Sequence, residues 1–146
     1  MQALTGSIAS SHVIKWLRAW YSEGMPDAID LEIVRQMLPS TPYGAGVREI
    51  KPPVEILGDA FEGMLARDPA DHALWGIAYN GKPRGERQRF TIAHELGHFI
   101  LHRSQKQSFN CDSQSVHTGI DGLRQIEREA DEFASNLLMP GDLLRE

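Results

Sequence analysis

Residues 87–102 read RQRFTIAHELGHFILH, and apolar side chains surround this stretch on nearly every side when it is drawn as a helix: Phe90, Ile92, Ala93, Leu96, Phe99, Ile100 and Leu101. A helix that is apolar all round is buried. His94 and His98 stand four residues apart, so both imidazoles lie on one helix face, one turn apart. Burying them with the carboxylate of Glu95 costs free energy unless these groups are paired or bind a metal. The stretch therefore predicts a buried helix over residues 87–102 that carries a metal site.

His94 to His98 form a His-Glu-x-x-His motif. Two imidazoles at this spacing can bind one zinc ion. Glu95 projects about 100° away around the helix, which places its carboxylate beside the metal, where it can accept a proton from a water molecule. A catalytic zinc site has three protein ligands and one position open to water. A third ligand must therefore come from elsewhere in the chain.

Two glutamates near the end of the chain compete for that role. Glu127 shares a helix flank with Asp131, Ala134 and Leu138, beside the apolar stripe of Ile126, Ala130, Phe133 and Leu137. Glu129 shares its flank with the polar residues Gln125, Glu132 and Asn136. We therefore expect Glu127 to face inward as the ligand and Glu129 to face water. Asp131 is placed to accept a hydrogen bond from a ligand imidazole and fix its tautomer; the alternative is a simple surface charge.

The residues around these helices predict an α+β fold. Helical spacing indicates a helix over roughly 7–22, a second helix capped by Asp27, and another helix within Ile120–Leu138. Prolines and glycines make 39–46 a loop, and the polar linker 105–119 is also expected to be a loop. Phe61–Arg67 and Ala73–Asn80 flank a turn at Asp68-Pro69, which predicts a hairpin. The expected fold is a small antiparallel sheet packed on helices, among them the motif helix and the glutamate-bearing helix.

Length and composition bound the class of protein. The chain has 146 residues, which fits one domain over 1–146. We expect a helical part at 1–48, with the sheet and both site helices in 49–146. A net charge of −5 argues against general nucleic-acid binding. Cys111 is the single cysteine, so no internal disulfide can form, and neither a signal peptide nor a membrane-spanning run is recognised. A cytoplasmic location is the resulting expectation.

Two blocks of the sequence resemble the ImmA/IrrE family of metallo-endopeptidases. Arg87–His98 is similar to the family's active-site helix and its approach. Glu127–Pro140, with its Leu-Leu-Met-Pro end, is similar to the family's glutamate helix. The strand that ends at Tyr79-Asn80 resembles the strand before the active-site helix. Together these segments cover residues 73–140, about half of the chain.

The resemblance implies a thermolysin-like, gluzincin-type site in which His94, His98 and Glu127 bind zinc and Glu95 is the catalytic base. Manganese or iron could replace zinc at such a donor set. Family members cleave or inactivate helix-turn-helix transcriptional repressors and so derepress genes. A repressor of this kind is therefore the expected protein substrate, with neither nucleic acid nor a membrane as a direct partner. The alternative is a metal-stabilised regulatory module that binds a repressor without cleaving it.

The oxyanion-stabilising group of such a site is left open. No histidine or tyrosine follows Asp131, although thermolysin-like enzymes take a side chain from that region to stabilise the developing charge. The upstream candidates are Tyr79, His102 and His117, besides a group of an incoming partner. His102 has two further interpretations: a support for the site one turn beyond His98, or a helix-end histidine stabilised by the helix dipole.

A short basic run precedes the motif helix: Lys82, Arg84, Arg87 and Arg89, interrupted by Glu86. It is interpreted either as a solvated loop or as a substrate rim, with Arg84 and Arg87, that attracts acidic residues of a partner. We expect that partner to bind in extended form along an edge strand near Ala73–Asn80.

Overall fold

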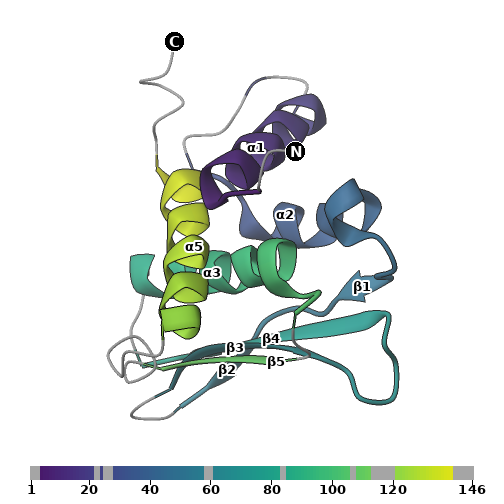
Figure 1. Cartoon of the computed structure of the whole chain (residues 1–146). Helices are drawn as coiled ribbons and strands as arrows, with labels where there is room; N and C mark the ends of the chain where they lie inside the picture. Colours follow the sequence, from purple (N-terminus) through teal and green to yellow (C-terminus); the bar gives the residue numbers. More distant parts are fainter. Residues whose placement is uncertain are drawn as a thin grey trace.

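Helices form one layer and a sheet forms the other, and the helices cover one face of the sheet (Figure 1). The structure is a computed structural model that describes residues 4–21, 24, 28–57, 61–82, 85–105, 108–112 and 121–139. The helices are α1 (Gly6–Trp20), α2 (Leu31–Met37), α3 (Glu86–His102) and α5 (Asp121–Leu138). The strands are β1 (Glu49–Ile50), β2 (Val54–Ile56), β3 (Phe61–Arg67), β4 (Leu74–Asn80) and β5 (Ser108–Asp112). The predicted α+β class is confirmed.

Capping side chains set where α1 and α2 begin. The hydroxyl of Thr5 accepts a hydrogen bond from the backbone N–H of Ile8 (3.1 Å), and the carboxylate of Asp30 accepts one from Glu32 (2.9 Å). Such bonds satisfy donors that a helix leaves without a partner in its first turn. Asp27, the predicted cap, lies outside the described residues; Asp30 is the cap because it directly precedes the first turn of α2. The predicted loop after α2 contains two short 3₁₀ helices, η1 (Leu38–Ser40) and η2 (Pro42–Gly44).

The sheet is mixed, whereas the sequence predicts an antiparallel one. β3 and β4 form the predicted antiparallel hairpin, with Leu65 opposite Ile77. β1 and β2 pair in parallel with the other side of β4, and β5 pairs antiparallel with the other side of β3. β1 and β2 precede the hairpin in the chain and β5 follows α3, so the sequence of the hairpin alone does not indicate these pairings.

β4 is therefore an interior strand, and the expected edge near Ala73–Asn80 is wrong. β4 pairs with β3 on one side and with β1 and β2 on the other, so it is not an edge to which a peptide could add along its length. The edges of the described sheet are β1 with β2 on one side and β5 on the other. β5 lies within the linker that the sequence predicts to be a loop, because its polar composition gives a weak strand signal.

Small residues allow α5 to cross closely over α3 and α1 (Figure 1). A Cβ added at Gly97 of α3 would lie 3.1 Å from the ring of Phe133 and 3.3 Å from the Cα of Ala130. A Cβ added at Gly6 of α1 would lie only 2.6 Å from the backbone of α5 at Glu129 and Phe133. The buried faces of these helices join the hairpin in one core. This close packing sets the short distance between α5 and the motif helix α3. Within the described ranges, no helix is both long and apolar enough to cross a membrane.

Candidate metal centre

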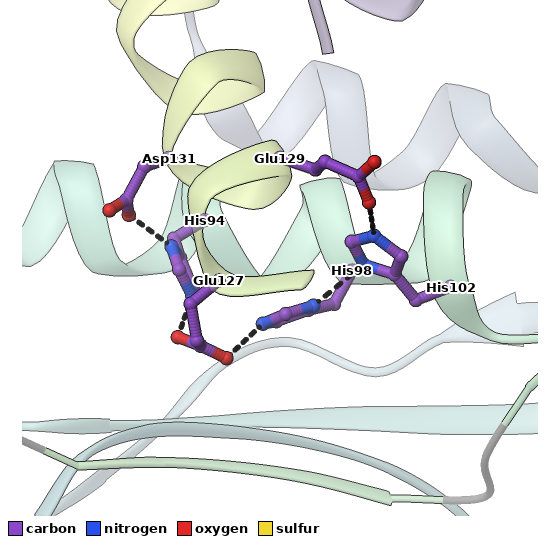
Figure 2. Close-up of polar contacts among 6 residues, drawn as sticks. All are labelled: His94, His98, His102, Glu127, Glu129 and Asp131. Carbon is purple, nitrogen blue, oxygen red and sulfur yellow. Dashed lines mark hydrogen bonds and ion pairs between the residues drawn. The ribbon is translucent and has the colours of Figure 1, made fainter. Parts of the chain in front are cut away.

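Three side chains from two helices converge at the crossing of α3 and α5 (Figure 2). The carboxylate of Glu127 bridges both imidazoles: Oε2 lies 3.0 Å from Nε2 of His94, and Oε1 lies 3.0 Å from Nε2 of His98. One ligand atom from each residue can be chosen so that all three lie within 4.8 Å of one another. Ligands of a tetrahedral zinc ion, at about 2.0–2.1 Å from it, are about 3.3 Å apart. Two imidazole nitrogens and one carboxylate oxygen at this spacing fit a single divalent ion.

The outer nitrogens of both imidazoles are occupied by other side chains. Nδ1 of His94 lies 2.7 Å from Oδ1 of Asp131, one helical turn after Glu127 on α5. Nδ1 of His98 lies 2.9 Å from Nδ1 of His102, the next turn of α3. Hydrogen bonds at Nδ1 fix the ring orientation and leave Nε2 directed at the shared carboxylate. The rings are therefore held ready to present Nε2 to a metal.

Glu95 lies beside this group at the contact between α3 and the sheet. Its side chain is fully buried, at 0% exposure. A Cβ added at Gly63 of β3 would lie 2.8 Å from Oε2 of Glu95 and 2.6 Å from Cγ2 of Thr91. The carboxylate can occupy its position only because residue 63 has no side chain. The sequence reasoning missed Gly63; a glycine inside a predicted strand is the signal for such a close approach.

The charges of the cluster follow from burial and from the shared carboxylates. Burial opposes the charged form of His94, but hydrogen bonds to Asp131 and Glu127 outweigh it and raise its pKa to about 10. Burial dominates at His98 and lowers its pKa to about 4. Burial alone would raise the pKa of Glu127, yet its hydrogen bonds with both imidazoles hold that pKa well below the ordinary range. At neutral pH the metal-free cluster thus holds a cationic His94, a neutral His98 and an anionic Glu127.

The polar flank of Glu129 predicts that this side chain faces water, but in the structure the side chain also contacts His102. Its Oε1 lies 2.7 Å from Nε2 of His102, and its side chain is 36% exposed. The neighbouring Glu132 accepts a hydrogen bond from the backbone N–H of Ser7 in α1 (2.9 Å). The flank is polar because it meets a histidine and a helix N-terminus, not because it is wholly solvated.

Phe109 of β5 completes the wall of the site, and the sequence reasoning missed it. Its ring stacks on the imidazole of His98, with centroids 4.8 Å apart and planes inclined by 12°. Phe109 is 3% exposed and His98 is 0% exposed. The edge strand β5 therefore lies directly against one of the converging histidines.

The remaining predicted site residues are placed as follows. Tyr79 lies half-buried on β4 opposite Gly63, and its role as an oxyanion donor stays a prediction. Both ring nitrogens of His102 are engaged, which leaves no N–H directed at a substrate. Arg87 forms an exposed ion pair with Glu62 of β3 (2.6 Å), so the carboxylate of Glu62 partly neutralises its charge. Arg84 and His117 lie outside the described residues.

A helix that carries His-Glu-x-x-His, with a third donor from a later glutamate helix, is the arrangement of a metallopeptidase-type site. The chain belongs to the family described as Peptidase_M78, IrrE N-terminal-like domain, whose family model matches residues 59–146. This match runs from the hairpin to beyond α5 and includes every residue of the converging group. The predicted resemblance to the ImmA/IrrE family is confirmed. The search of curated proteins gave no match.

Proposed function

We propose that this protein is a zinc-dependent endopeptidase. The convergence of His94, His98 and Glu127 next to the buried carboxylate of Glu95 is the observation that carries the proposal. Membership of a peptidase family supports it. The donor set, two imidazole nitrogens and one carboxylate oxygen, is one that catalytic zinc sites use.

In this proposal the three converging side chains hold the metal and Glu95 handles the proton. When bound, zinc would act as a Lewis acid that polarises the scissile carbonyl and lowers the pKa of a water molecule. The carboxylate of Glu95 accepts a proton from the attacking water and then donates it to the leaving amide nitrogen as the C–N bond breaks. Gly63 keeps that carboxylate in place by allowing β3 to approach α3.

The proposed substrate is a helix-turn-helix transcriptional repressor, cleaved so that its target genes are expressed. An extended segment of such a protein can satisfy its backbone hydrogen bonds by adding to a sheet edge. β5 is the edge strand beside His98, since Phe109 stacks on that imidazole. We therefore assign the substrate-binding edge to β5.

The second candidate is a metal-stabilised module that binds a repressor without cutting it. The engagement of both nitrogens of His102 favours it, because one of the predicted oxyanion donors is occupied by other side chains. Both candidates use the same metal ligands. They differ in whether the partner is shortened and in whether Glu95 matters.

The test is to mix the purified chain with the helix-turn-helix protein encoded beside it, with and without zinc, and to identify fragments by mass spectrometry. The endopeptidase proposal predicts fragments with zinc and none with the Glu95→Gln variant. If the partner stays intact and co-elutes with the unaltered chain as well as with the Glu95→Gln variant, the result supports the binding module instead.

A further inference from the structure

A line of hydrogen bonds leads away from His98 on the side opposite Glu127 (Figure 2). Nδ1 of His98 lies 2.9 Å from Nδ1 of His102, and Nε2 of His102 lies 2.7 Å from Oε1 of Glu129. The two converging histidines are therefore supported differently. Nδ1 of His94 meets the carboxylate of Asp131 directly, whereas Nδ1 of His98 is linked to a carboxylate, that of Glu129, through the imidazole of His102.

The donors in this line follow from one condition, that Nε2 of His98 faces a metal and carries no proton. His98 then carries its proton on Nδ1 and donates to Nδ1 of His102, which must accept. His102 in turn carries its proton on Nε2 and donates to the carboxylate of Glu129. Two neutral imidazoles have two N–H groups, which is the number these two hydrogen bonds need. With a metal on the inner side, the line needs a hydrogen-bond acceptor at its outer end, and the carboxylate of Glu129 supplies it.

The line runs through a part of the molecule that excludes water. His98 is 0% exposed and His102 is 1% exposed. Phe109 stacks on the ring of His98 and lies near the ring of His102, with centroids 4.8 Å and 6.2 Å apart. In such surroundings hydrogen bonds strengthen and polarise one another, and an unmatched polar group is costly. Glu129, at the outer end, is the only member of this line that reaches the surface, at 36% exposure.

We propose that His102 and Glu129 are positioning residues of the metal site. Glu129 holds His102 in the tautomer that accepts from His98, and His102 thereby fixes the ring of His98 with Nε2 toward the metal. This inference rests on the proposed metal site. Carboxylates that act on a ligand imidazole increase its basicity and its affinity for metal. The effect of Glu129 reaches His98 through one intervening ring.

The direct test measures zinc affinity of the metal-free, full-length chain by competition with a chromophoric chelator. Glu129→Ala should weaken zinc binding by about tenfold, the lower end of what loss of such a partner costs. Glu129→Gln keeps an acceptor oxygen and should recover part of that loss. Glu132→Gln is the matched control, because it removes one negative charge from the same flank of α5 but contacts Ser7 instead of His102.

A second measurement reads the tautomers in the zinc-loaded protein by ¹H–¹⁵N NMR of the histidine rings. The inference predicts a proton on Nδ1 of His98 and on Nε2 of His102. A proton on Nδ1 of His102 would overturn it, whatever the affinities show. Because Glu129 is partly exposed, its variants are expected to fold, which far-UV circular dichroism can verify.

Glu127→Ala separates failure of this inference from failure of the metal site. If Glu127→Ala abolishes zinc binding while Glu129→Ala binds within twofold of the Glu132→Gln control, the metal site stands and the positioning role is overturned. If Glu127→Ala binds zinc as tightly as the unaltered chain, the metal site is wrong and the inference falls with it. Loss of affinity in Glu129→Ala with partial recovery in Glu129→Gln supports the proposal.

Discussion

Replacing Gly63 by alanine should disturb the proposed catalytic base without touching the proposed metal ligands. The added methyl group would lie 2.6 Å from Cγ2 of Thr91 and 2.8 Å from Oε2 of Glu95, where ordinary contact begins at 3.4 Å. The groups must therefore separate by about 0.6–0.8 Å, between β3 and a helix whose other side packs on α5. Neither Thr91 nor Glu95 can move freely, since both are buried.

Two effects of known size follow from that displacement. Overpacking of this kind costs about 1–3 kcal/mol of folding free energy. Misplacing a reacting group by about 1 Å can cost about 10²-fold in rate, so we expect cleavage by Gly63→Ala to fall by about 10- to 100-fold. Zinc content should stay unchanged, because the three atoms nearest to the added methyl group belong to Thr91, Glu95 and Ala78 and not to a proposed metal ligand.

The assays are chemical denaturation for stability, cleavage of the partner repressor for rate, and elemental analysis for zinc. Gly76→Ala is the control: Gly76 lies on the neighbouring strand β4, and nothing lies within 4 Å of a Cβ added there. That variant should lose little stability and no activity. Equal stability and equal cleavage rates for the two variants would refute the reasoning that Gly63 makes room for Glu95.

Three further predictions concern the cluster itself. Glu127→Ala should lose zinc whereas Glu129→Ala should retain a full equivalent at saturating metal, which elemental analysis after dialysis against zinc can check; the opposite pattern would mean that α5 presents its other flank. Glu95→Gln should keep the fold and the zinc while cleavage falls by a factor on the order of 10²–10⁴; full cleavage by this variant would remove Glu95 from the mechanism. In metal-free protein, the raised pKa of His94 contributes stability that is complete below its unfolded value of 6.5 and is lost as pH rises toward about 10. The lowered pKa of His98 acts in the other direction, so stability is lost as pH falls from 6.5 toward about 4. Denaturation midpoints of the metal-free chain should therefore be highest near pH 6.5, and a midpoint that rises steadily from pH 5 to pH 9 would contradict these assignments.

The motif helix could be predicted because its information is local. Apolar residues on all sides indicated burial, and the four-residue spacing placed His94 and His98 on one face. The side of α5 that faces the site also followed from helix geometry, since Glu127 borders the apolar stripe that contains Ala130 and Phe133. Both inferences needed only residues within one helix.

The features that the sequence reasoning missed depend on contacts between distant segments. β5 has few strand-forming residues, and it exists through its pairing with β3. Phe109 reaches His98 only because of that pairing. Glu129 looked solvated because its neighbours on α5 are polar, and its partner His102 belongs to another helix. Gly63 carried a local signal, but its meaning depended on Glu95 lying opposite it.

The claim at the centre of this account is that the chain binds one metal ion between α3 and α5. The most direct measurement is the metal content of protein purified without added metal, followed by zinc titration of the same sample. The account predicts about one equivalent of divalent metal per chain at saturation. Less than a tenth of an equivalent, with no uptake when zinc is added, would contradict it.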